Sequence, residues 1–211
     1  MPAFIAEITS LHAVQASATV AATTANPFFW YVTRAAAVSA YIVLTVVVLL
    51  GISRSLVRIS GSRASWMLEE IHQFLAILVA ALVGLHLLSL FLDPLIPFSL
   101  LNFALPIAEP YRPFAVDLGV LSLYGLVIVL GSSWLRRYIK HTSWRALHYI
   151  SFAIFLLLTL HGVLAGSDSG QPWMIFVYLV ASAAVVLMTI IRMLWVPSNA
   201  PSAARPTTRS S

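Results

Sequence analysis

The sequences IHQFLAILVAALVGLH, residues 71–86, and ALHYISFAIFLLLTLHG, residues 146–162, decide the fold. Each is an apolar run that carries two histidines: His72 and His86 in the first, His148 and His161 in the second. An ionisable side chain inside an apolar, membrane-length helix is costly and is by default a sign of function. Two such pairs in one chain therefore indicate a site built between two membrane helices.

The composition is that of a membrane protein. The chain has 211 residues, 60% of them hydrophobic and 9% charged, and a mean hydropathy of +0.93, whereas an ordinary globular domain carries about 25% charged residues. The sequence contains no cysteine, which excludes iron–sulfur ligation by its own thiolates, c-type haem attachment and disulfides. The net charge of +5 comes from short basic patches between apolar segments, which favours a lipid bilayer over nucleic acid as the partner.

Five apolar stretches are long enough to cross about 30 Å of hydrocarbon as helices that rise about 1.5 Å per residue. They cover residues 28–52, 71–92, 114–132, 144–164 and 173–195. We therefore expect an all-α membrane protein, with a bundle of five transmembrane helices in residues 27–196. Residues 1–26 are expected to form a polar or interfacial flank, and the Pro/Ser/Ala/Arg-rich residues 197–211 a disordered tail.

The charges between these stretches predict the orientation of the chain. Basic residues gather after the first stretch, before and at the start of the fourth, and in the tail; they are Arg54, Arg58, Arg63, Arg136, Arg137, Lys140, Arg145, Arg205 and Arg209. Lys and Arg prefer the cytoplasmic side of a membrane. We expect the N terminus outside, the C terminus in the cytoplasm, and a multi-pass location in the cell inner (cytoplasmic) membrane.

This orientation makes the second and fourth helices run in the same direction. His72 and His148 then lie at the inner leaflet, and His86 and His161 lie at the outer leaflet, about 20 Å away. Neutral imidazoles on two facing helices supply both axial ligands of a haem b. We expect an inner haem on the first pair and an outer haem on the second, because four histidines at two paired depths exceed what interhelical hydrogen bonding alone explains.

The unequal spacings of the two pairs predict an irregular helix. At about 3.6 residues per turn, the fourteen residues from His72 to His86 return to nearly the same helix face, whereas the thirteen from His148 to His161 end about 140° away. The fourth helix is therefore tightened or kinked, or the two haems approach it from different sides. A protein with a single haem is the alternative on this ground.

Both quoted stretches, with YRPFAVDLGVLSLYGL at residues 111–126 between them, resemble the ferric-reductase-like transmembrane domain. That domain is shared by ferric reductases, NADPH oxidases and the haem-binding membrane subunit of the methionine sulfoxide reductase system. The resemblance covers about residues 28–194 and implies two b haems, on His72 with His148 and on His86 with His161. Leu90 stands one turn past His86, where the oxygen-reducing members have a further histidine, which puts superoxide production in doubt.

Two arginines are candidates for contacts to haem propionates. Arg34 lies at the expected depth of the outer haem, where the oxidases resemble this chain in having an arginine; snorkelling to the outer interface is the alternative. Arg145 lies one turn before His148. The proline-rich connection 93–113 is expected to lie along the outer interface, where it either partly covers the outer haem or packs on the rim of the bundle.

The function predicted from these features is transmembrane electron transfer. The sequence has no glycine-rich dinucleotide motif and no soluble domain after the fifth helix, so a flavin or quinone is expected to act through a partner. Electrons would come from a cytoplasmic flavoprotein reductase or from quinol, pass from the inner to the outer haem, and leave to an extracytoplasmic acceptor. The alternatives are a quinol-linked haem subunit of a larger respiratory complex, and a non-redox transporter or assembly subunit.

Overall fold

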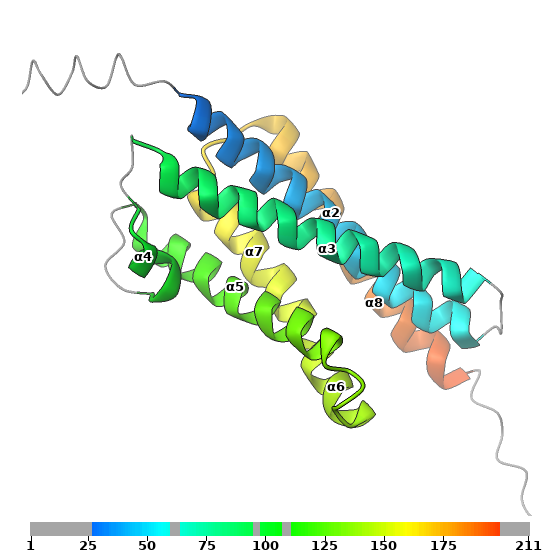
Figure 1. Ribbon diagram of the computed structural model, residues 1–211. Helices are drawn as coiled ribbons and strands as arrows, with labels where there is room; N and C mark the ends of the chain where they lie inside the picture. Colours follow the sequence, from blue (N-terminus) through cyan, green and yellow to red (C-terminus); the bar gives the residue numbers. More distant parts are fainter. Residues whose placement is uncertain (1–26, 60–63, 95–97, 107–110, 199–211) are drawn as a thin grey trace, which may run out of the picture.

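The structure is a computed structural model that describes residues 27–59, 64–94, 98–106 and 111–198. Within these ranges the chain forms helices joined by short turns, and no strand occurs among them. In chain order the helices are α2 (Phe28–Ile59), α3 (Ala64–Leu92), α4 (Leu100–Ala104), α5 (Pro113–Trp134), α6 (His141–His148), α7 (Ile150–Ala165) and α8 (Pro172–Ser198) (Figure 1). The predicted flank 1–26 lies outside the described residues.

Five helical segments are long and apolar enough to cross a membrane, which confirms the predicted all-α architecture. They are Phe28–Arg54, Trp66–Leu92, Pro113–Trp134, His141–Ala165 and Pro172–Leu194. Helix α3 begins before the predicted residue 71, because the preceding ASWMLEE is rich in good helix formers although it is not uniformly apolar. Helix α8 likewise runs to Ser198, two residues into the predicted tail, whose remainder lies outside the described residues.

The helices form two groups that meet along α2. Helices α3 and α8 both pack on α2, whereas α7 packs mainly on α5, and α2 also contacts α7 (Figure 1). Apolar side chains from both groups form one core, which contains Val48, Ile52, Val79, Ile154 and Phe155. The two helices with the histidine pairs, α3 and the α6–α7 segment, therefore lie in different groups and face each other across this core.

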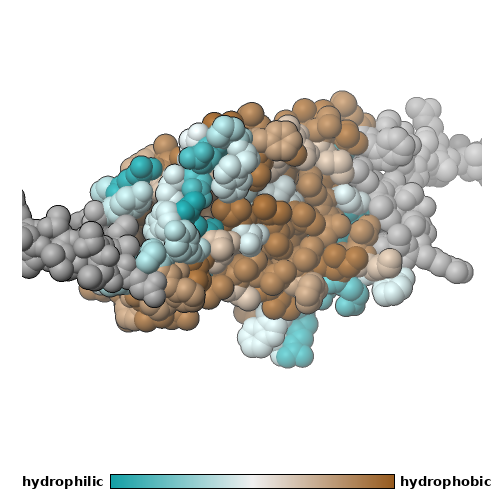
Figure 2. All heavy atoms as spheres, turned by 90° about the horizontal axis from the view of Figure 1, so that it is seen from above, coloured by the Kyte–Doolittle hydropathy of each residue, from teal (hydrophilic) through white to brown (hydrophobic). Residues whose placement is uncertain are grey.

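The outward faces of the helices are also apolar. Phe74, Ile77, Phe176 and Leu179 each expose 65% or more of their surface, and Figure 2 shows hydrophobic side chains over much of the face that it presents. Apolar patches of this extent are rare on soluble monomers. They are expected where lipid is the solvent, so these faces suit contact with a bilayer.

The fourth membrane-length segment is broken directly after its first histidine. Helix α6 ends at His148 and α7 begins at Ile150. Tyr149 between them has φ −66° and ψ −17°, and its carbonyl accepts a hydrogen bond from the Phe152 amide at 3.2 Å. A turn with this three-residue bond advances about 120° per residue instead of about 100°. The break confirms the irregularity predicted from the thirteen-residue spacing, and its tightening rotates His161 toward the face of His148.

The described part of the connection 93–113 packs on α5 and on the C-terminal end of α7. The Tyr124 hydroxyl donates a hydrogen bond to the carbonyl of Ala104, and the Arg112 guanidinium donates to the carbonyl of Leu164 at 2.5 Å. A cation at the C-terminal end of a helix is favoured by the helix dipole. These contacts are those of a segment on the rim of the bundle; residues 95–97 and 107–110 lie outside the described ranges.

Candidate functional site

The first histidine pair brings two imidazoles close together across the bundle. The rings of His72 on α3 and His148 at the end of α6 have centroids 6.1 Å apart and an interplanar angle of 56°. Two imidazoles that bind one metal ion from opposite sides, each at about 2.0–2.1 Å, have ring centres about 6 Å apart. The pair therefore has the separation that a shared metal ion requires.

His72 is held by the backbone of α2. Its Nδ1 lies 3.0 Å from the carbonyl oxygen of Val47, and the ring lies against Gly51. A carbonyl oxygen can only accept, so Nδ1 carries the proton and Nε2 keeps a lone pair. This tautomer, fixed by a carbonyl, is the arrangement in which histidines bind metals in proteins.

His161 is held in the same way by α5. Its Nδ1 lies 2.7 Å from the carbonyl oxygen of Ala115, and the ring covers Gly119 so closely that a Cβ atom there would lie 2.8 Å from Cε1. Hydrogen is the largest substituent that fits at residue 119 while the ring stays in place. His161 can therefore occupy this position only because residue 119 is a glycine.

His86 is the third histidine with a carbonyl partner. Its Nδ1 lies 3.1 Å from the carbonyl oxygen of Thr33 on α2. The Thr33 hydroxyl donates to Ser89 Oγ at 2.8 Å, and the Ser89 hydroxyl donates to the His86 carbonyl at 2.9 Å. His161 on α7 and His86 on α3 are thus held by the carbonyls of Ala115 and Thr33. These two acceptors lie near the N-terminal ends of α5 and α2, so the second pair lies nearer the opposite end of the bundle from the first.

The three carbonyl acceptors share one local pattern. Each is followed four residues later by a small residue, in the pairs Val47 with Gly51, Thr33 with Ala37, and Ala115 with Gly119. A helical carbonyl already accepts a hydrogen bond from the amide four residues ahead. A second donor can reach the oxygen beside that amide only when the side chain there is small. The pattern explains how each imidazole gains its helix-bound partner.

His148 is positioned by packing instead of by a hydrogen bond. Its Nδ1 is buried and has no hydrogen-bond partner in the described part of the chain. The ring stacks on Trp144, with centroids 5.1 Å apart and planes 28° apart. Trp144 is in turn covered by the guanidinium of Arg136 at 4.5 Å. The ring is thus oriented by α6 itself, one residue before the break at Tyr149.

A cavity of about 320 Å³ adjoins the His72–His148 pair, which is within the usual range for small-molecule sites. Its lining includes the apolar core residues Val79 and Ile154; Leu75, Val83, Phe155 and Leu158 belong to or pack on the same core. Its mouth carries cations, among them Arg54, Arg145 and Arg192. Arg145 and His141 both line this cavity, and both are exposed.

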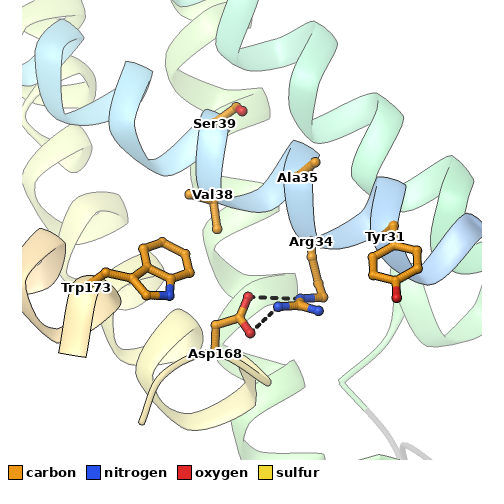
Figure 3. Close-up of a pocket in the computed structure, with 7 residues that line it drawn as sticks. All are labelled: Tyr31, Arg34, Ala35, Val38, Ser39, Asp168 and Trp173. Carbon is orange, nitrogen blue, oxygen red and sulfur yellow. Dashed lines mark hydrogen bonds and ion pairs between the residues drawn. The ribbon is translucent and has the colours of Figure 1, made fainter. Parts of the chain in front are cut away.

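Arg34 lies at the end of the bundle opposite the His72–His148 pair and forms an ion pair with a carboxylate. Its Nε donates to Asp168 Oδ2 at 2.9 Å, and a second guanidinium nitrogen donates to Oδ1 (Figure 3). The guanidinium also lies 4.1 Å from the centroid of the Trp30 ring. Arg34 and Asp168 border a pocket of about 380 Å³ together with Tyr31 and Trp173. The neighbouring Thr33, and not Arg34, contacts His86.

The Arg34–Asp168 pair is expected to stabilise the fold by about 1 kcal/mol, because it is bidentate and only partly exposed. A double-mutant cycle of Arg34→Gln and Asp168→Asn, followed by thermal unfolding in detergent, measures this coupling. Single effects that simply add would contradict the expectation.

The site contains residues that sequence reasoning did not find. The carbonyl partners, the glycines and Arg192 became visible only when the neighbours of each helix were known. No group of three or more His, Asp or Glu side chains positioned for a metal ion occurs in the described ranges 27–59, 64–94, 98–106 and 111–198. The chain matches no protein-family model, no curated protein and no solved structure.

Proposed function

We propose that the chain is a di-haem b membrane cytochrome of the ferric-reductase-like kind. It passes electrons from a cytoplasmic flavoprotein or membrane quinol, by way of an inner and then an outer haem, to an extracytoplasmic acceptor. The observation that carries this proposal is the set of Nδ1–carbonyl hydrogen bonds at His72, His86 and His161, which leave each Nε2 free to bind a metal. A bound haem would supply one-electron chemistry at its iron.

The residues present fit such a group. A porphyrin occupies four positions on its iron, so two histidines per haem complete the coordination without a larger cluster of protein ligands. The apolar part of the cavity lining suits the porphyrin ring. Carbonyl bonds to Nδ1 also increase the basicity of the ligating nitrogen, which stabilises the bond to iron.

The arginine-rich end of the bundle is assigned to the cytoplasm in this proposal. Arg136, Arg137, Arg145 and Arg192 lie at or near the end that carries His72 and His148, which suits the preference of basic residues for that side. The pair His86 and His161 then lies at the outer level. Fourteen helical residues from His72 to His86 give a separation of about 20 Å between the levels along α3.

Trans-bilayer electron transfer tests the proposed function. The full chain is reconstituted into vesicles with ferricyanide trapped inside and dithionite added outside. We expect the trapped ferricyanide to be reduced at least tenfold faster than in vesicles without protein, because the four histidines would hold a haem at each of two depths. Equal rates would contradict the proposal. Replacing dithionite by reduced flavin or by quinol then distinguishes the two classes of donor.

A further inference from the structure

Arg145 and Arg192 converge on one neutral oxygen at the mouth of the cavity. Arg145 is on α6 and Arg192 is on α8, yet each donates a hydrogen bond to the hydroxyl of Tyr149 at 3.3 Å. The Arg192 guanidinium also lies 5.9 Å from the centroid of the Tyr149 ring. Both arginines and the tyrosine line the cavity that adjoins His72 and His148. Two elements far apart in the sequence thus direct two cations to the same point.

The charge of these two arginines is not balanced within the described part of the chain. Glu69 is paired with Arg54 at 2.9 Å and with Arg136 at 3.4 Å. No ion pair joins Arg145 or Arg192 to a carboxylate among the described residues. Arg145 is exposed and Arg192 is partly exposed at the cavity, so an anionic ligand can reach them and supply the balancing negative charge. A phenol oxygen shared by two cations does not provide that charge.

A second observation at the same cavity also indicates a missing acceptor. Trp144 and His148 both line the cavity, and the Nε1 of Trp144 and the Nδ1 of His148 are buried without a hydrogen-bond partner in the described ranges. A tryptophan Nε1–H can only donate. Unpaired buried polar groups are uncommon in folded proteins and usually indicate an absent ligand, ion or water. The mouth therefore offers several donors to a ligand rich in acceptor oxygens.

We propose that Arg145 and Arg192 bind the two propionate carboxylates of the porphyrin held between His72 and His148, with Trp144 Nε1 as a further donor. This inference rests on the proposed function. A porphyrin with two carboxylates on one edge of an apolar ring matches a cavity that is apolar inside and cationic at its mouth. Guanidinium–carboxylate hydrogen bonds are charge-assisted and among the strong ones in proteins. Positive charge beside the porphyrin also favours the reduced iron, which carries one positive charge fewer.

The test compares haem with haem dimethyl ester, in which both carboxylates are neutral. The full-length protein is produced without haem, placed in nanodiscs and titrated with each compound. The double variant Arg145→Gln/Arg192→Gln is expected to bind haem at the inner level at least tenfold more weakly than the unmodified protein, and to bind the ester equally well. Arg137→Gln is the matched control, because Arg137 is a cation of the same region that stacks on Tyr138 and does not line the cavity.

The reduction potential gives a second readout that simple misfolding would not produce. In the haem-loaded double variant, the ratio of reduced to oxidised inner haem at a fixed potential should fall about tenfold, which corresponds to about 59 mV for one electron. The outer haem should keep its potential. Lysine at both positions keeps the charge and is expected to restore most of the inner potential.

Three results would overturn the inference while the proposed function stands. The first is equal binding of haem by variant and unmodified protein, and the second is an equal loss of affinity for the ester, which would make the arginines structural. The third is an effect of the variant seen only with phosphatidylglycerol in the nanodisc and absent with phosphatidylcholine alone, which would assign the arginines to lipid headgroups. Failure of the unmodified protein to bind haem at either level would instead overturn the proposed function.

Discussion

Replacing His86 or His161 by leucine is expected to remove the outer haem alone, to halve the haem content and to abolish trans-bilayer electron transfer. Each change would remove one of the two histidines proposed to hold that haem, and leucine offers no lone pair to replace it. The inner haem should stay reducible from the cytoplasmic side, because His72 is held by Val47 of α2 and His148 by Trp144 of α6. Neither contact involves the outer pair.

The measurement is the reduced-minus-oxidised spectrum of each purified variant, together with its haem content. His72→Leu and His148→Leu should show the converse loss of the inner haem. His12→Gln is the matched control, since His12 precedes all five apolar stretches of the sequence, and this change should leave both haems bound. Loss of both haems from each of the four single changes would contradict two independently assembled sites.

Gly119→Ala is expected to weaken binding of the outer haem by about 10- to 100-fold, the usual effect of disturbing a group that orients a metal ligand. The added Cβ would lie 2.8 Å from Cε1 and 2.9 Å from Nδ1 of His161, which is closer than van der Waals contact allows. The imidazole must therefore move away from α5 and lose its 2.7 Å hydrogen bond to the Ala115 carbonyl. Both the position and the fixed tautomer of His161 depend on that bond.

Two further glycines provide comparison variants for Gly119→Ala. A Cβ atom at Gly51 would lie 3.4 Å from Cε1 of His72, and one at Gly131, on the same helix as Gly119, would have no neighbour within 4 Å. Haem titration of the three alanine variants should therefore give a large outer effect for Gly119→Ala, a small inner effect for Gly51→Ala and none for Gly131→Ala. Similar affinities in Gly119→Ala and Gly131→Ala would show that the close approach does not orient His161.

The fold was predictable because membrane length and hydropathy are local properties of the sequence. The five apolar stretches became five membrane-length helices, and their ends differed where polar but helix-forming residues, such as Glu69 and Glu70, extended a helix beyond the apolar run. The break at Tyr149 was also predictable, since thirteen residues do not complete whole turns of a regular helix. The number of residues between the two histidines did not show, however, that the break lies next to His148.

The candidate site was only partly predictable. Histidines in apolar helices are visible in the sequence, but their carbonyl partners depend on which helices are neighbours. Thr33 lies 53 residues from His86, and Ala115 lies 46 residues from His161. Arg34 and Asp168 are 134 residues apart in the sequence. The sequence therefore predicted the depth of Arg34 in the membrane but not its partner. Arg192 was missed because a single arginine near the end of an apolar helix resembles an ordinary topology signal.

The number of b haems per chain tests the central claim most directly. A dithionite-reduced minus oxidised spectrum of the purified full-length protein, combined with a pyridine haemochrome assay and a protein determination, gives this number. Two bound b haems per chain are expected, one for His72 with His148 and one for His86 with His161. One haem would contradict the two-level arrangement, and a protein without haem would contradict the proposed function as a whole.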